Sequence, residues 1–224
     1  MKLDRKLCMG FMRALLTISI GIYLPGCSLT GEAFSGYVLE QGTESPIEGA
    51  IVVAGWKGHV ATWAHGRTVC YHVETAVTDS NGRFHFPAWR KDISEKWQKN
   101  VRFERVSIEV YKSGYERPSS FLDGRYYLQI FNESASDRLR QLDQVVSSTA
   151  CPSAGDSYRN LHQLFRAVYK EAKQVSQTLD EKKHAERFGY LAADSLADKS
   201  KSVEYDERGR LISVNPNNSF RAGE

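Results

Sequence analysis

The sequence predicts an α+β protein, in which an antiparallel β-sandwich of about seven strands is followed by a helical C-terminal region. Between residues 34 and 131, short runs rich in Val, Ile, Phe and Tyr alternate with Gly, Pro, Asp and Asn, which is typical of strands joined by tight turns. After residue 132 the apolar residues recur three and four positions apart, as on amphipathic helices. A chain of 224 residues can hold both parts in one medium domain with an appended subdomain.

The first 26 residues have the composition of a bacterial export signal. Basic residues at the start precede a largely apolar run over residues 11–24, which is shorter than the roughly 20 apolar residues of a transmembrane helix. The run ends in Leu-Pro-Gly-Cys at residues 24–27, which resembles the lipobox of bacterial lipoproteins. The resemblance implies that Cys27 becomes the mature N-terminus and carries acyl chains such as palmitate. Such an anchor is stable because each buried methylene contributes about 0.8 kcal/mol.

Two other interpretations of this leader are open: a plain signal peptide cut nearby, and an uncleaved N-terminal anchor. Ser28, rather than Asp, follows the cysteine. Under the sorting rule of enteric bacteria, this favours the outer membrane, facing the periplasm or the cell surface. The leader also holds the whole formal charge of +3, since it has four basic residues and one acidic residue. The remaining chain is electrically balanced, which is not typical of a nucleic-acid-binding protein.

Four cysteines are present, at positions 8, 27, 70 and 151. Cys8 would leave with the leader and Cys27 would carry lipid, so Cys70 and Cys151 remain. In an exported bacterial protein two remaining thiols most simply form a disulfide, because the periplasm is oxidising. That bond would restrict the unfolded chain by roughly 4 kcal/mol and would join the β region to the helical tail. Two free buried thiols and an intermolecular bond are the alternatives.

Strands are expected, in chain order, at residues 34–39, 47–56, 68–78, 83–86 and 101–112, with a last pair within 120–131. The run Ala50–Ala54 is apolar throughout, which indicates burial on both faces of its sheet. The segment Asp79–Gly82 ends in Asn-Gly and has the composition of a tight turn. Two longer segments interrupt the pattern. We expect a loose insertion at residues 57–67, and one helical turn or a long loop at residues 88–100.

Short motifs in this region occur in the order typical of one known domain. They are Gly-Tyr-Val-Leu from Gly36, Pro-Ile-Glu-Gly-Ala from Pro46, Thr-Asp-Ser-Asn-Gly-Arg-Phe ending at Phe84, and a closing Gly-Tyr. Over about 80 residues the chain thereby resembles the carboxypeptidase regulatory-like domain. The resemblance implies a transthyretin-like Greek-key sandwich, which is not itself catalytic and accompanies metallocarboxypeptidases, outer-membrane receptors and surface proteins. The matching positions are Gly36, Val38, Pro46, Gly49, Ala50, Val52, Thr78, Asp79, Gly82, Phe84, Gly114 and Tyr115.

Several signature residues have a clear physical use. Gly49 allows a tight turn into its strand, and Gly82 supplies a left-handed turn residue. Asp79 can accept hydrogen bonds from the amides of its turn, and Phe84 can fill the core. The signature therefore specifies a fold. A recognition surface is expected in the two insertions, because loops carry function more often than the strands that support them.

Three helices are expected after the sandwich, at residues 134–146, 156–179 and 181–197. The middle one has the strongest pattern, because apolar residues recur at helical spacing from Leu161 to Val175. A small hairpin about Arg208–Gly209 and a frayed end follow. The predicted organisation is a lipoprotein signal at residues 1–26, a sandwich at 34–131, a helical extension at 132–200, and a hairpin with a tail at 201–224.

No catalytic residues are predicted. The sequence has no Gly-x-Ser-x-Gly motif and no glycine-rich phosphate loop. Histidines gather in the insertion at residues 57–72, and imidazole is a favoured ligand of transition metals, but their spacing matches no zinc signature. Aromatic and histidine side chains of the two insertions form a candidate binding surface for a glycan or a protein: Trp56, His59, Trp63, His65, Trp89 and Trp97.

These observations favour a non-enzymatic, lipid-anchored protein of the cell envelope, whose β-sandwich is a binding or structural module. Its partners would be the membrane, through the N-terminal lipid, and an envelope protein or a glycan. No nucleic acid, metal or other cofactor is expected. The alternative is a periplasmic metal-binding or hydrolytic factor that uses the His-rich insertion at residues 57–72.

Overall fold

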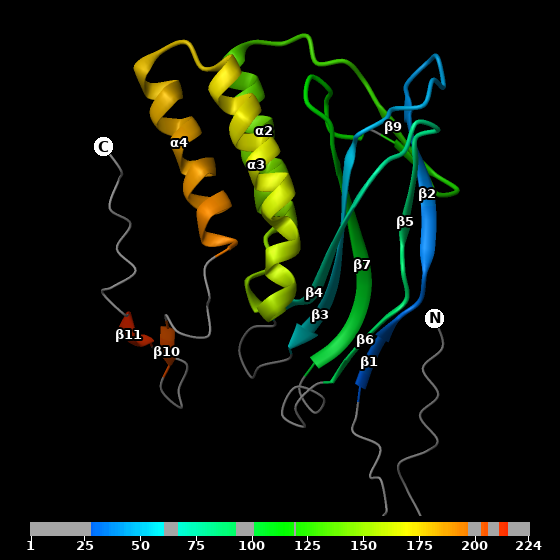
Figure 1. The fold of residues 1–224 in the computed structure, drawn as a ribbon, viewed down its shortest axis with the longest axis vertical. Helices are drawn as coiled ribbons and strands as arrows, with labels where there is room; N and C mark the ends of the chain where they lie inside the picture. The colour runs from blue at the N-terminus through cyan, green and yellow to red at the C-terminus, as the bar shows by residue number, and fades with distance from the viewer. Residues whose placement is uncertain are drawn as a thin grey trace, which may run out of the picture.

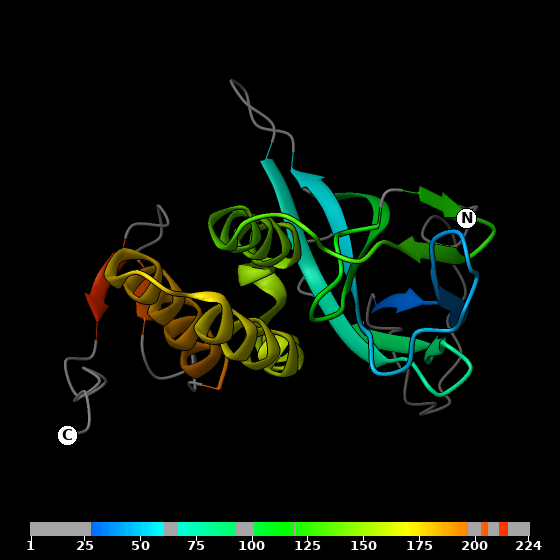
Figure 2. The same cartoon turned by 90° about the horizontal axis from the view of Figure 1, so that it is seen from above.

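The computed structural model describes residues 28–60, 67–92, 101–118, 120–196, 203–205 and 211–214. Within them the fold is mixed α+β, as predicted. Two β-sheets lie face to face, and helices cover the outer side of one of them (Figure 1, Figure 2). The predicted leader, the side chains of Trp63, His65 and Trp97, and the end of the chain from residue 215 lie outside the described residues. In the described part, no helix is both long enough and apolar enough to cross a membrane.

The first sheet, called here the open sheet, contains four strands in the order β5-β2-β9-β8. These strands are β2 (Phe34–Glu40), β5 (Arg83–Phe86), β8 (Ser120–Leu122) and β9 (Arg125–Leu128). β2 is antiparallel to β5 but parallel to β9, so one pair departs from the predicted antiparallel pattern. A parallel neighbour needs a long crossover connection, and here the chain passes through the other sheet before it returns as β9.

The second sheet, called here the covered sheet, has the order β4-β3-β7 and is antiparallel throughout. β3 (Ile51–Val60) and β4 (Arg67–Val77) form a long hairpin, and β7 (Val101–Tyr111) pairs with the other edge of β3. β3 begins later than the predicted residue 47, because Gly49 has a φ of 69° and turns the chain just before it. β3 also continues to Val60, so the first residues of the expected insertion extend the strand.

Alternate residues of β3 point to opposite faces of the covered sheet, and both faces are buried. One core lies between the two sheets and contains Val38, Ile47, Ala50, Val52, Ala54, Trp56, Tyr71, Phe84, Phe86, Val110, Tyr126 and Leu128. A second core lies between the covered sheet and the helices, where Ile51, Val53, Cys70, Val73 and Tyr111 meet apolar helix residues. The predicted burial of Ala50–Ala54 on both faces is therefore confirmed.

The turn between β4 and β5 is the one predicted at Asp79–Gly82. Asp79 Oδ1 accepts hydrogen bonds from the backbone amides of Asn81 and Arg83, both at 2.9 Å. Gly82 has a φ of 70°, and a Cβ there would lie 2.5 Å from the carbonyl oxygen of Val38. Only glycine fits such a position without displacing backbone atoms. The predicted uses of Asp79 and Gly82 are confirmed.

Helices of the described C-terminal part are α2 (Ala135–Thr149), the 3₁₀ helix η1 (Pro152–Leu161), α3 (His162–Val175) and α4 (Leu179–Asp194). Ser134 caps α2 by accepting a hydrogen bond from the amide of Asp137, and Thr178 caps α4 in the same way. The predicted helix start at residue 156 is wrong, because η1 occupies that segment. Asn160 Nδ2 of η1 donates to Val73 O at 2.9 Å, which holds η1 against β4.

The predicted disulfide is present in the structure. It joins Cys70 of β4 to Cys151, the residue before η1, with their Cα atoms 5.0 Å apart. Both side chains are buried in the core beneath the helices. The bond ties together two segments that are 81 residues apart, one from the covered sheet and one from the helical part.

A strand pair that the sequence did not predict begins the described fold. β1 (Ser28–Gly31) pairs antiparallel with β6 (Trp89–Asp92), with Gly31 opposite Trp89 and Ser28 opposite Asp92. The indole of Trp89 occupies the space that a Cβ on residue 31 would need. The expectation of a loop or helical turn is therefore wrong for residues 89–92. Farther along the chain, β10 (Val203–Tyr205) and β11 (Leu211–Val214) pair where a hairpin was predicted.

Candidate binding surfaces

Two of the predicted binding tryptophans pack against each other inside the sandwich. Trp56 of β3 is 4% exposed and Trp89 of β6 is half-buried. Their ring centroids lie 5.2 Å apart in an edge-to-face arrangement, and the imidazole of His72 lies 4.0 Å from the Trp89 centroid. Such pairs contribute beyond their buried area, so this cluster stabilises the end of the sandwich. Trp56 is therefore a core residue and not part of an exposed platform.

His72 is a buried histidine whose surroundings disfavour the charged form of its imidazole. Burial, together with the charge of Lys91, lowers the pKa of its imidazole to about 4. Its Nε2 lies 3.0 Å from Glu74 Oε1, and among the residues that the structure describes neither ring nitrogen has a hydrogen-bond partner of suitable geometry. Burial also raises the pKa of Glu74. Burial thus disfavours the charged form of both side chains relative to water.

The other predicted residues of this surface are not brought together in the described structure. His59 is half-buried near the end of β3, opposite Thr68, while Trp63, His65 and Trp97 lie outside the described residues. Within the described part of the chain, no three side chains of His, Cys, Asp or Glu gather closely enough to hold a metal ion.

Basic side chains lie at this end of the sandwich, one of them near the aromatic cluster and another against α2. Lys91 Nζ donates to Tyr71 O at 3.0 Å, and Lys57 Nζ donates to Ser148 O at 3.2 Å, near the end of α2. Burial and the nearby charge of Arg105 lower the pKa of Lys57. Arg90 and Arg105 are exposed. Glu74 and Glu109 lie beside these groups, so the charge of this end is mixed.

The outer face of the open sheet is a second candidate surface. The helices pack on the covered sheet, on the far side of the sandwich, so they leave this face exposed (Figure 1). Tyr37 of β2 is 42% exposed and stands opposite Arg83 of β5 on one side and Arg125 of β9 on the other. Adjacent strands are about 4.8 Å apart, so the phenol lies between two exposed guanidinium-bearing side chains. In the described part of the chain, neither arginine has an ion-pair partner.

A second row of polar and aromatic groups extends this face. His85 of β5 stands opposite Ser35 of β2, and His85 Nδ1 lies 2.8 Å from Ser35 Oγ. Toward the other end, Tyr127 of β9 stands opposite Leu39, and both are half-buried. Tyr and Arg are enriched in protein interfaces, and Tyr binds with little loss of conformational entropy. The composition is that of a recognition surface.

The sequence prediction missed this face. The alternation in β2, β5 and β9 was visible in the sequence and separates buried from outward residues. Alternation alone does not say which outer face the helices will cover, because helix docking is a long-range property of the fold. A signal was nevertheless present: the outward positions Tyr37, Arg83 and Arg125 carry large side chains of the types that dominate binding energy.

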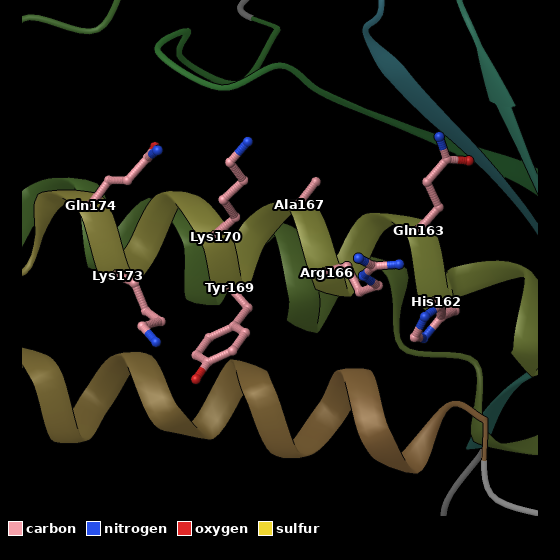
Figure 3. Close-up of a pocket in the computed structure, with 8 residues that line it drawn as sticks. All are labelled: His162, Gln163, Arg166, Ala167, Tyr169, Lys170, Lys173 and Gln174. Atoms are coloured by element: carbon pink, nitrogen blue, oxygen red, sulfur yellow. The ribbon is translucent and has the colours of Figure 1, made fainter.

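A shallow groove of about 780 Å³ follows α3 (Figure 3). Its lining residues all come from this one helix: His162, Gln163, Arg166, Ala167, Tyr169, Lys170, Lys173 and Gln174. Tyr169 Oη donates to Glu186 Oε2 at 2.8 Å, and Lys173 Nζ lies 5.2 Å from the centre of its ring. Tyr169 thus packs α3 against α4. A groove lined by one helix has no opposing wall to hold a small ligand.

Comparisons with known proteins give little further information. The chain matches no model of a known protein family and no curated protein. Among solved structures it is similar to a crystal structure of a 9R-lipoxygenase from Cyanothece PCC8801, with 11% sequence identity and a TM-score of 0.23. The similarity covers 71% of this chain and 29% of the lipoxygenase chain. At this TM-score the similarity carries no argument about fold or function.

Proposed function

We propose that the protein is a non-enzymatic, lipid-anchored protein of the bacterial cell envelope, placed at the outer membrane by acyl chains on Cys27. Its β-sandwich is a binding module of the carboxypeptidase regulatory-like type, with Greek-key connections. The outer face of the open sheet binds an envelope protein.

The lipobox-like motif and its position next to the first described strand carry this proposal. β1 begins at Ser28, one residue after the cysteine of the lipobox-like motif, and it pairs at once with β6. In a lipoprotein the mature chain begins at the acylated cysteine. Processing at Cys27 would therefore keep every residue of the described fold in the mature chain.

The signature residues support the sandwich type. Gly49 and Gly82 both have positive φ, Asp79 accepts two amide hydrogen bonds in its turn, and Phe84 is 2% exposed. Gly36 lies against the ring of Phe84, where a Cβ would meet the phenyl carbon atoms. Gly49, Gly82, Asp79 and Phe84 thus have the physical uses expected of them, which supports a sandwich of this type.

The open sheet supports a binding role. Its outer face carries Tyr37 between Arg83 and Arg125, and the helices leave it uncovered. Hot spots of protein interfaces are enriched in Tyr and Arg. A flat surface of this kind suits another protein better than a small molecule, which binds in concave sites.

Metabolic labelling with a palmitate analogue tests the anchor. We expect the wild-type protein to be labelled, Cys27→Ala to lose the label, and Cys8→Ala to keep it, because Cys8 is removed with the leader. Equal labelling of wild type and Cys27→Ala would contradict the proposal. The Cys8→Ala variant controls for general effects of cysteine removal on export.

A further inference from the structure

β4 is an edge strand of the covered sheet, and η1 caps part of its edge. Val73 N donates to Ser157 Oγ at 3.3 Å, and Val73 O accepts from Asn160 Nδ2 at 2.9 Å. The backbone groups of Val73 thus point away from β3. In an antiparallel pair this direction alternates along the strand, so the amides and carbonyls of Thr75 and Val77 also point away from β3.

The edge beyond Val73 is free. Among the residues that the structure describes, no hydrogen bond from outside the sheet reaches the backbone of Thr75 or Val77. In the same part of the chain, Thr75 Oγ1 is buried without a hydrogen-bond partner, and Val77 is 43% exposed. Each of these residues offers a backbone donor and a backbone acceptor. Unpaired groups along a strand edge are a template for another strand.

Thr75 and Val77 face the side of the sheet on which the helices pack. They stand opposite Val53 and Ile51 of β3, whose side chains lie in the core beneath the helices. Residues that stand opposite each other in an antiparallel pair share a face. Val77 is exposed although it faces this side, so the helices leave this corner of the covered sheet open.

The chain from Asn160 to Ala167 runs beside this part of β4. Asn160 binds Val73 at one end of the segment. At the other end, Ala167 O accepts a hydrogen bond from Tyr111 Oη at 3.1 Å, and Tyr111 pairs with the same β3 residue as Val77. The start of α3 therefore extends from the capped part of the edge to the level of its free part.

The groove along α3 opens beside the free edge. Gln163, Ala167 and Lys170 line it on the side of α3 that faces away from α4 (Figure 3). Gln163 is exposed and lies between Asn160 and Ala167 in the chain, so it is level with this part of β4. The groove lacks an opposing wall, and a segment paired with β4 would supply one.

The charge of the groove favours an acidic occupant. Its lining residues include three exposed cations, Arg166, Lys170 and Lys173, and no carboxylate. On the adjoining helix surfaces, Glu171 is buried in an ion pair, and Glu186 accepts a hydrogen bond from the tyrosine of the groove. Lys170, which lies away from α4, has no ion-pair partner among the described residues.

Two carboxylates of the β region lie near the free edge but outside the groove. Glu74 stands opposite Ala54, whose side chain is in the core between the sheets, and Glu74 Oε2 accepts from Asn160 Nδ2 at 3.0 Å. Glu48 is exposed just before β3, where Lys112 Nζ donates to its backbone oxygen. Neither residue lines the groove, which keeps its positive charge.

We propose that the free edge at Thr75–Val77 and the adjoining groove of α3 bind an extended, acidic segment of a partner protein, which adds as a strand to the covered sheet. The backbone of the segment pairs with Thr75 and Val77, and an acidic side chain on the helix side pairs with Lys170. In such strand addition, main-chain hydrogen bonds provide affinity and alternate side chains provide specificity. The site uses neither Cys27 nor the outer face of the open sheet, so it is tested separately from the proposed function.

Amide hydrogen exchange of the purified full-length protein, followed by NMR, tests whether the edge is free. The amides of Glu74 and Ala76 point toward β3, so we expect those of Thr75 and Val77 to exchange at least about tenfold faster. Equal exchange of these amides overturns the inference, because it would show that the edge is already paired.

A short synthetic peptide in which Glu and Val alternate is the probe for binding. We expect it to slow amide exchange at Thr75 and Val77 at least about fivefold, because both amides become hydrogen-bonded. The same peptide with Lys in place of Glu is the matched control and should have little effect, since its charge repels Lys170. Failure of the Glu peptide to protect the two amides overturns the site. Equal protection by the Lys peptide overturns the acidic partner.

Two variants separate the backbone contact from the charge. Val77→Pro removes an edge-facing N–H, and proline is tolerated at edge positions of this kind. We expect it to weaken binding of the Glu peptide by about tenfold, the worth of one hydrogen bond, and Lys170→Gln to weaken it severalfold. Lys170→Gln changes only an exposed side chain, so it tests the site even if Val77→Pro does not fold.

The matched control, Lys182→Gln with Arg187→Gln, removes two exposed charges from α4 and should bind the Glu peptide as wild type does. Wild-type affinity of Lys170→Gln, or a loss in the control as large as in Lys170→Gln, overturns the proposed contact.

A second copy of the chain is the other occupant that a free edge allows. Sedimentation velocity of wild type and Val77→Pro over a range of concentrations distinguishes the two. A monomer that binds the Glu peptide supports the proposal. A wild-type dimer that Val77→Pro dissociates overturns it, because the edge then serves self-association.

Discussion

Arg138 Nη2 of α2 lies 2.9 Å from Glu171 Oε1 of α3, and the two side chains are only 3% and 5% exposed. The same carboxylate accepts hydrogen bonds from Tyr111 Oη at 2.7 Å and from Gly114 N at 2.9 Å. Burial, and then the charge of Glu171, raise the pKa of Tyr111, so its hydroxyl stays protonated and donates. One buried ion pair thereby joins two helices to the end of β7.

Removing one partner of this pair should be strongly destabilising. Glu171→Ala leaves the guanidinium of Arg138 buried without its counter-charge, so we expect the free energy of unfolding to fall by about 3–5 kcal/mol. Denaturant titration of the purified protein, followed by circular dichroism, measures this loss. Glu186→Ala is the matched control, because it removes a carboxylate from the exposed hydrogen bond to Tyr169 and should cost less than about 1 kcal/mol. Similar losses in the two variants would contradict the structural role of the buried pair.

The disulfide should be a second support of the helical part. The Cys70–Cys151 disulfide joins residues that are 81 positions apart, and its reduction frees the unfolded chain from this constraint. We therefore expect the free energy of unfolding to fall by about 2–5 kcal/mol. Denaturant titration with and without dithiothreitol measures this change. The variant with both Cys70→Ala and Cys151→Ala should show the same stability with and without reductant. A response of this variant to dithiothreitol would mean that the effect does not come from the bond.

His72 should make the protein sensitive to mild acid. Its folded-state pKa of about 4 lies below the ordinary value of 6.5, so the unfolded chain binds more protons between these pH values. The stability that depends on a neutral His72 is therefore complete above pH 6.5 and is lost as the pH falls toward 4. Glu74 acts in the opposite direction, because its raised pKa favours the folded state as the carboxyl group becomes protonated.

The comparison of wild type with His72→Gln isolates the histidine from Glu74. Between pH 7 and pH 4, we expect wild type to lose up to about 3 kcal/mol more stability than His72→Gln. Urea titrations at several pH values measure this difference. An unchanged profile in His72→Gln would show that the acid sensitivity has another origin.

The outer face of the open sheet should matter for binding and not for stability. Tyr37→Ala and the pair Arg83→Glu with Arg125→Glu change exposed side chains, so we expect unfolding free energies within about 0.5 kcal/mol of wild type. If Tyr37 is a hot spot, its loss weakens partner binding by roughly 30-fold or more, since hot spots contribute at least about 2 kcal/mol. Photo-cross-linking in cells from position 35, with and without these changes, measures the loss. Cross-linking that persists at the wild-type level in both variants would show that Tyr37 and the two arginines do not carry the interaction.

Local patterns in the sequence predicted much of the sandwich. The apolar run Ala50–Ala54 indicated a strand buried on both faces, and the turn residues Asp79 and Gly82 indicated the bend between β4 and β5. The pairing of Cys70 with Cys151 was predicted from the proposed export signal and the number of remaining thiols. These features depend on neighbouring residues or on composition, so a single sequence contains them.

Features that depend on distant pairing were missed. The segment Trp89–Asp92 has no alternating apolar pattern, and its strand partner is β1, far upstream. The parallel pairing of β2 with β9 likewise depends on the path of the chain through the covered sheet. The candidate surface around Tyr37 could not be singled out, because its exposure depends on where the helices dock. Pairings between distant segments do not produce a periodic pattern of apolar residues within either segment, so they cannot be predicted from such patterns.

Two glycines of the predicted family signature offer a last test, because their surroundings differ while their backbone conformations agree. Gly82 has a φ of 70° and Gly114 a φ of 80°. A Cβ at position 114 would meet no atom within 4 Å, whereas at position 82 it would lie 2.5 Å from the carbonyl oxygen of Val38 and 3.2 Å from the amide of Ile47. Positive φ alone costs roughly 1–2 kcal/mol for an L-residue.

We therefore expect Gly114→Ala to cost about 1 kcal/mol and Gly82→Ala about 3 kcal/mol or more, since the second variant adds a clash with backbone atoms to the same conformational cost. Val38 O also accepts the amide of Ile47 at 3.0 Å, so moving this carbonyl away from a new Cβ would disturb an existing hydrogen bond. Thermal and denaturant unfolding of the two variants measure both costs. Equal destabilisation would show that conformation alone requires these glycines, and that the close approach of β2 to the turn can relax freely.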